Sequence, residues 1–76
     1  MKFCEWLKVK RSETFGRPSQ ETTAKILHVK LGTYRSWEQG AAEPPNYYQY
    51  MLRQYWDRII YDGWEDIREK EQNIYQ

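Results

Sequence analysis

The apolar residues of this chain recur three or four positions apart, which is the spacing of one face of an α-helix. The longest stripe follows Pro45 and comprises Tyr48, Met51, Leu52, Tyr55, Trp56, Ile59 and Ile60. No stretch of the sequence shows the sustained alternation of β-branched and polar residues that is typical of a strand. The pattern therefore predicts an all-α fold with a long amphipathic helix capped by Asn46.

Helix-breaking residues divide the first half of the chain into three shorter helices. The first is expected over residues 2–13, and the Gly16-Arg17-Pro18 run ends it, because proline disfavours helix in the residue before it. Ser19 is a favoured N-cap for a second helix of about two turns. The third is expected over residues 30–39, and Gly40 closes it.

Two alternatives are open at Asp62-Gly63, inside the last apolar stripe. Either the fourth helix ends there and a fifth begins at Trp64, or one helix continues through Gly63 at a cost of roughly 1 kcal/mol relative to alanine. We expect two helices and therefore a five-helix fold.

Size and composition favour a single domain over residues 1–76, because a chain this short buries only a modest fraction of its surface. Cys4 is the sole cysteine, so no intrachain disulfide can form, and a reducing compartment such as a bacterial cytoplasm is expected. No apolar run has the length needed to cross a bilayer, so no membrane association is expected.

Charge is distributed unevenly along the chain although the net charge is only +1. Residues 1–40 carry eight Lys or Arg and four Asp or Glu, whereas residues 41–76 carry four and seven. Such asymmetry indicates that the N-terminal half faces a polyanion.

Residues 19–44 carry a recognisable motif, which consists of Ser19-Gln20-Glu21, Ala24, Leu27, Val29, Thr33, Trp37-Glu38-Gln39-Gly40 and Pro44. This run resembles, without a gap, the helix-turn-helix of the Cro/lambda-repressor-type (XRE) family. In length the chain is most similar to small phage and mobile-element regulators, such as anti-CRISPR-associated repressors. The resemblance implies a lambda-repressor-like DNA-binding domain with its helix-turn-helix core at residues 19–40.

Three residues depart from the family pattern. Thr23 replaces a core leucine, and His28 replaces a turn glycine at a position that usually requires positive φ. Gly32 lies early in the third helix and offers no side chain to a base. These departures affect base specificity more than the fold. Glu38 is expected to pair inside the domain with a helix end or a basic group.

The resemblance also assigns roles in double-stranded DNA binding. The outward residues of the third helix are expected to contact bases in the major groove; these residues are Lys30, Thr33, Arg35 and Ser36. Arg35 is the foremost candidate, because its guanidinium can bind guanine O6 and N7 together. Phosphate contacts are expected from residues at helix starts and from one basic residue that adds attraction without base specificity; they are Arg17, Ser19, Gln20, Asn46 and Tyr47.

The aromatic C-terminal half, residues 46–75, exceeds what one small domain can bury from one side, so part of it is expected to form a homodimer face. The predicted dimer residues are Tyr55, Trp56, Ile59, Tyr61 and Trp64. We therefore expect a dimeric transcriptional (auto)repressor that binds an inverted-repeat operator.

The alternative is a protein-interaction module, an inhibitor or antitoxin that reuses this fold and binds a protein partner through its acidic C-terminal half. An enzyme is not expected, because the sequence has no nucleophile–base set, phosphate loop or paired carboxylates. Neither a cofactor nor a metal is expected, since His28 is the sole histidine and Cys4 the sole cysteine.

Overall fold

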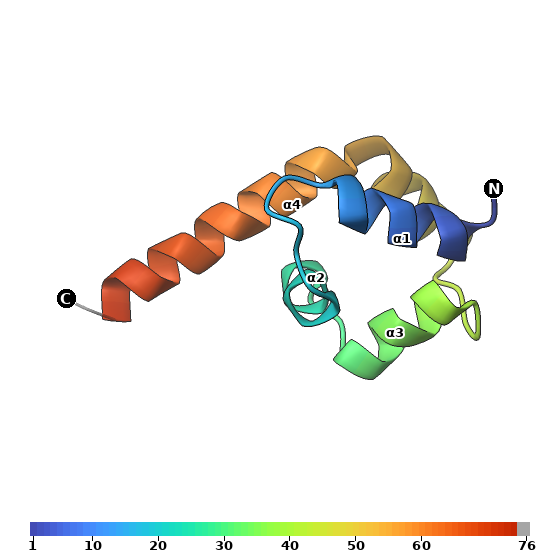
Figure 1. Ribbon diagram of the computed structural model, residues 1–76, viewed down its shortest axis with the longest axis horizontal. Coiled ribbons are helices and arrows are strands. Elements are labelled where there is room, and N and C mark those ends of the chain that lie inside the picture. The colour runs from blue at the N-terminus through green and yellow to red at the C-terminus, as the bar shows by residue number, and fades with distance from the viewer. Residues whose placement is uncertain (75–76) are drawn as a thin grey trace.

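Four helices make up the part of the chain that the structure, a computed structural model, describes, namely the backbone of residues 1–74 and the side chains of residues 1–68 (Figure 1). They are α1 (Phe3–Glu13), α2 (Gln20–Leu27), α3 (Leu31–Gln39) and α4 (Asn46–Ile74). The all-α prediction is confirmed. Helices α1 to α3 gather beside the first half of α4, and the second half of α4 projects beyond them, so the molecule measures 44 × 23 × 21 Å.

The five-helix prediction is wrong, because α4 continues through Gly63 and no separate helix starts at Trp64. At Gly63 helix α4 passes very close to α2: a Cβ on Gly63 would overlap Cγ2 of Ile26 and lie 2.7 Å from its Cγ1. The helix is interrupted earlier, at Tyr55, where φ of −123° and ψ of 15° depart from helical values. Gly63 thus permits close packing and does not end the helix.

The core contains side chains from all four helices and is centred on Trp56. This indole is fully buried, and its N–H donates to Oγ1 of Thr14 at 2.7 Å. Trp6 meets it edge-on, with ring centroids 5.8 Å apart. The other members of the buried core cluster are Phe3, Leu7, Ala24, Ile26, Leu27, Tyr34, Trp37, Leu52 and Ile60.

The apolar stripe of α4 is only partly buried. Tyr55, predicted to belong to it, is 55% exposed and occupies the non-helical position. Within residues 1–74, no helix is both long enough and apolar enough to cross a bilayer.

The close approach at Gly63 leads to a prediction about stability. Gly63→Ala should lower the free energy of unfolding by about 1–2 kcal/mol, because the added methyl group overlaps the buried Ile26 and outweighs the helix propensity gained. Urea denaturation followed by circular dichroism measures the change.

The matched control is Gly32→Ala in the first turn of α3, where a Cβ would meet nothing within 4 Å. It should raise the free energy of unfolding by roughly 0.5–1 kcal/mol. A Gly63→Ala variant as stable as the Gly32→Ala variant would contradict the packing account.

Candidate nucleic-acid interface

Helix α2 starts at a well-formed cap. The Ser19 hydroxyl accepts the Thr22 backbone N–H at 3.1 Å, which satisfies one of the free donors of the first turn. Thr23 is fully buried, and its hydroxyl donates to the Ser19 carbonyl at 2.8 Å. The threonine that stands in place of a core leucine is therefore accommodated without an unpaired hydroxyl.

The turn between α2 and α3 depends on one residue with left-handed backbone geometry. His28 has φ of 59° and ψ of 39°, which confirms the positive φ expected at this position. The N–H groups of His28 and Val29 donate back to the carbonyls of Lys25 and Ala24 at 3.1 and 3.0 Å. This hydrogen-bonded reversal ends α2 and allows α3 to start at Leu31.

The inner face of α3 is buried and its outer face is open. Tyr34, Trp37 and Glu38 point into the domain, and Gly40, with φ of 79°, ends the helix. The predicted base-contacting residues Thr33 and Arg35 are exposed, Ser36 is half-buried, and Lys30 is exposed at the N-cap.

Gln39 is an additional outward residue that the sequence analysis missed. It is exposed and lies four positions after Arg35, so the two side chains share one face of α3. It stands between Glu38 and Gly40 in the motif, where the sequence analysis gave it no role. The four-residue spacing between Gln39 and Arg35 is the sequence signal that could have identified Gln39 as an outward residue of the same helix face.

The predicted phosphate-binding residues flank α3. Arg17 and Ser19 are exposed in the segment that leads into α2, while Asn46 and Tyr47 are exposed in the first turn of α4, beyond the C-terminal end of α3. Gln20 differs from them, because both polar atoms of its side chain are engaged within the domain: Nε2 donates to Glu38 and Oε1 accepts from Arg35.

An ion pair between the partly buried Arg11 and the buried Glu38 fixes α3 against α1. Glu38, whose side chain is 3% exposed, accepts from Arg11 Nε at 2.7 Å and from Arg11 Nη2 at 3.1 Å. Arg11 Nη1 also donates to the Pro18 carbonyl at 3.3 Å, which secures the segment before α2. The expectation that Glu38 pairs inside the domain is confirmed.

These hydrogen bonds determine the ionisation of Glu38. Burial alone would raise the pKa of its carboxyl group, but the hydrogen bonds from Arg11 and Gln20 hold that pKa below its ordinary value. Beside the pair, burial raises the pKa of Tyr34. The Tyr34 hydroxyl has no hydrogen-bond partner among the described residues. Glu38 is thus a charged structural group.

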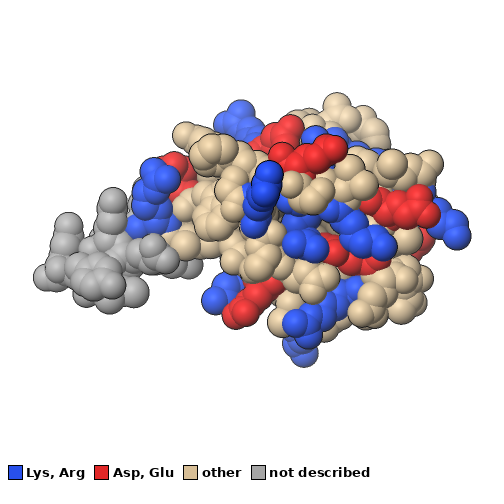
Figure 2. Space-filling model, in the orientation of Figure 1, with Lys and Arg blue, Asp and Glu red and all other residues tan. Residues whose placement is uncertain are grey.

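Cations lie along the α2–α3 edge of the molecule. Lys25, Lys30 and Arg35 are exposed there, and Glu21 lies 3.9 Å from the Lys25 ammonium group. Figure 2 shows Lys and Arg side chains along its lower edge with an acidic group among them. The edge suits a polyanion better than the whole-chain charge of +1 suggests.

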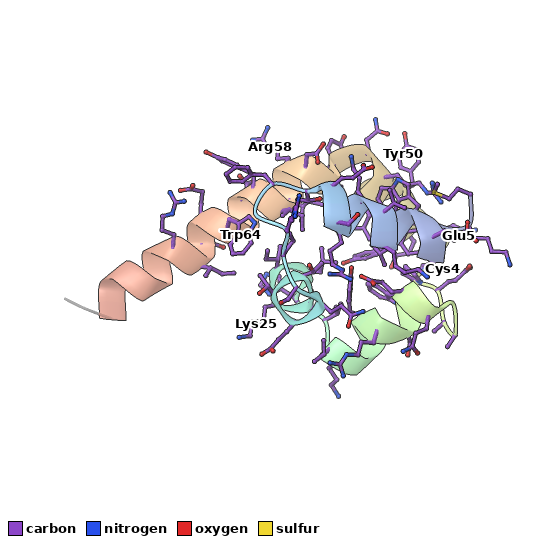
Figure 3. All side chains as sticks on the ribbon, viewed as in Figure 1. Cys4, Glu5, Lys25, Tyr50, Arg58 and Trp64 are labelled. Carbon is purple, nitrogen blue, oxygen red and sulfur yellow. The ribbon has the colours of Figure 1, made fainter. Side chains whose placement is uncertain are left out.

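A hollow of about 490 Å³ lies on another part of the surface, between the α1–α2 connection and the second half of α4. Its lining residues are Phe15, Gly16, Tyr61, Trp64, Glu65, Ile67 and Arg68. Trp64 reaches from α4 towards the connection (Figure 3), where its indole N–H donates to the Phe15 carbonyl at 3.2 Å. Below we call this hollow the aromatic groove.

The five predicted dimer residues do not form one patch. Trp56 is fully buried, so it belongs to the core and presents no surface to a second copy. Tyr61 and Trp64 line the aromatic groove, whereas Tyr55 and Ile59, one turn apart, lie on a different flank of α4. Phe15, which is 83% exposed, joins the groove from a loop that the helical pattern does not cover.

No protein-family model matches the chain, and no curated protein or solved structure matches it. Among the described residues, no three His, Cys, Asp or Glu side chains gather closely enough to hold a metal ion.

The buried ion pair leads to a pH-dependent prediction. Glu38→Gln should lower the free energy of unfolding by about 2 kcal/mol at pH 7, because Arg11, whose side chain is only partly exposed, loses its charged partner. The folded-state pKa of Glu38 lies below its ordinary value of 4.5. Its stabilising effect is therefore complete above that pH and is lost as the pH falls through the lower, folded-state value.

The difference in stability between the wild type and Glu38→Gln should accordingly shrink below pH 4.5. Urea denaturation at a series of pH values measures it, with Glu43→Gln, which removes the same charge from an exposed loop, as the control. A difference that stays constant down to pH 2 would contradict an ionised Glu38.

Proposed function

We propose that this protein is a sequence-specific DNA-binding regulator of transcription that acts as a dimeric (auto)repressor on an inverted-repeat operator. The observation that carries the proposal is the open outer face of α3, held at a fixed angle to α2 by the His28 turn. An α-helix with polar outward side chains fits the major groove of B-DNA, where the base edges differ for each pair.

The positions of the cations support the same proposal. Lys30 and Arg35 are exposed on α3 or at its start, and the capped N-terminus of α2 adds backbone N–H groups suited to a phosphate. Phosphate contacts fix the register on the duplex, and contacts to base edges select the sequence. Repression needs no further surface, because a protein that occupies a promoter excludes polymerase from it.

The dimer is part of this proposal, and we assign the aromatic groove to a second copy of the chain. Glu65 and Arg68 lie one turn apart on the rim, 3.6 Å from each other, so a twofold axis can place the acid of one copy opposite the base of the other. The second half of α4 points away from α3 (Figure 1), so pairing there leaves both α3 helices free.

The aromatic groove also favours a second candidate function, namely an inhibitor or antitoxin that binds an enzyme. An exposed aromatic hollow is a common site of protein association. The two functions differ in salt dependence: DNA affinity falls steeply with salt, whereas binding through an aromatic groove changes little.

Selection of bound duplexes from a random pool tests the proposed function directly. We expect an inverted repeat, and log affinity for the selected duplex should fall linearly with log salt concentration. Recovery of no preferred sequence at any salt concentration would reject sequence-specific binding.

Arg35 is the residue whose removal should change specificity most. Arg35→Ala should reduce the preference for the selected duplex over random duplex by about 10- to 100-fold, the range of one bidentate base contact. Arg58→Ala, which removes the same charge from α4 on the side away from α3 (Figure 3), is the control and should leave that preference unchanged. If Arg35→Ala kept the same preference for the selected duplex as Arg58→Ala, base recognition would lie at residues other than Arg35.

The assignment of the aromatic groove can be tested without DNA. Phe15→Ser should weaken dimerisation at least tenfold in sedimentation velocity, because Phe15 is 83% exposed in the single chain and supplies apolar surface to the groove. Tyr50→Ser, at a side chain 66% exposed in the first half of α4 and outside the lining of the groove, is the matched control. A monomeric wild type, or a Phe15→Ser variant that dimerises normally, would contradict the assignment.

A further inference from the structure

The side chain of Gln20 lies between a buried anion and an exposed cation. Its Nε2 donates to Glu38 Oε1 at 3.2 Å, and its Oε1 accepts from Arg35 Nε at 3.4 Å. Glu38 is itself held by two hydrogen bonds from Arg11. A continuous series of contacts therefore leads from α1, through the interior, to the most important candidate base-contacting side chain.

The two neighbouring charges determine which way the carboxamide of Gln20 faces. In the opposite orientation its oxygen would meet the carboxylate of Glu38, and its NH₂ group would meet the guanidinium of Arg35. Both contacts would be repulsive, because a carboxylate only accepts hydrogen bonds and a guanidinium only donates them. The amide is thus oriented from the inside before any ligand arrives.

The contact leaves a defined part of Arg35 available. A guanidinium has five N–H donors, of which the single one on Nε faces Gln20 and the four on Nη1 and Nη2 remain. Bidentate binding of guanine O6 and N7 needs two donors side by side, which the two terminal nitrogens supply.

We propose that Gln20 is a positioning residue that orients Arg35 so that its terminal nitrogens bind a guanine. This inference rests on the proposed DNA-binding function and assigns Gln20 a role other than the phosphate contact that the family resemblance implies. Gln20 determines specificity through Arg35 and does not itself touch a base.

Side-chain length and polarity make glutamine the suitable residue for this task. Asparagine is one methylene shorter and cannot span the same two partners from the same backbone position. Glutamate would place a second carboxylate against Glu38, which destabilises the domain. Methionine keeps the length and volume and lacks both hydrogen-bonding groups, so Gln20→Met isolates the polar contacts.

Competition binding tests the proposal, with the duplex that the wild type selects from a random pool measured against a random-sequence duplex. Gln20→Met should reduce the preference for the selected duplex by about three- to tenfold, the equivalent of one or two hydrogen bonds. In an Arg35→Ala background the same substitution should cause no further reduction, since the side chain that Gln20 orients is gone. Glu21→Ala, which alters the neighbouring exposed residue, is the control and should preserve the preference.

A phosphate contact gives the opposite pattern. If the Gln20 side chain bound a phosphate, Gln20→Met would weaken both duplexes equally, and its effect would add to that of Arg35→Ala. Equal weakening of both duplexes, or an effect that adds to that of Arg35→Ala, would overturn the positioning role. Sequence-specific binding by the wild type would remain intact in both cases.

The free protein supplies a second measurement that does not depend on DNA. The Nε–H resonance of Arg35 should shift and exchange faster with solvent in Gln20→Met, whereas in Glu21→Ala it should match the wild type. An Arg35 resonance unaffected by Gln20→Met would overturn the inference even if the wild type selects a duplex. A wild type that selects no duplex would instead refute the proposed function.

Discussion

The ion pair between Arg11 and Glu38 is the contact on which the arrangement of the first three helices depends. It joins the end of α1 to the inner face of α3, and the additional bond from Arg11 to Pro18 includes the segment before α2. A buried charge costs desolvation energy unless its hydrogen bonds are complete. Since Arg11 and Gln20 complete those of Glu38, the polar interior tolerates little change in the angle between α2 and α3.

A second constraint, steric and apolar, fixes α2 from its other side. Ile26 packs against α4 at Gly63, where there is no room for a methyl group. Helix α2 is therefore held by polar contacts towards α1 and α3 and by close packing towards α4. These polar contacts and this close packing together set the orientation of the outer face of α3. The exposed residues of that face lie outside the apolar core.

Local sequence signals predicted the elements whose geometry is decided locally. Ser19 as N-cap, His28 with positive φ and Gly40 as a helix end all follow from short-range backbone chemistry, and the structure has each of them. Gly63 misled the prediction because helix propensity describes an isolated helix, whereas here a neighbouring helix requires glycine. The contacts of Gln20 with Arg35 and Glu38 join residues 15 and 18 positions apart, and the contact of Trp64 with Phe15 joins residues 49 positions apart, so no periodicity reveals them.

The length of α4 has a consequence for any twofold assembly built on its second half. From Asn46 to Trp64 the helix rises roughly 27 Å at the usual 1.5 Å per residue, so it separates the start of α4, beside the end of α3, from the aromatic groove. The interruption at Tyr55 lies midway along that span. In the dimer proposed above, a few degrees of change in the backbone at Tyr55 would alter the distance between the two α3 helices, and with it the spacing of the two half-sites that the pair could bind.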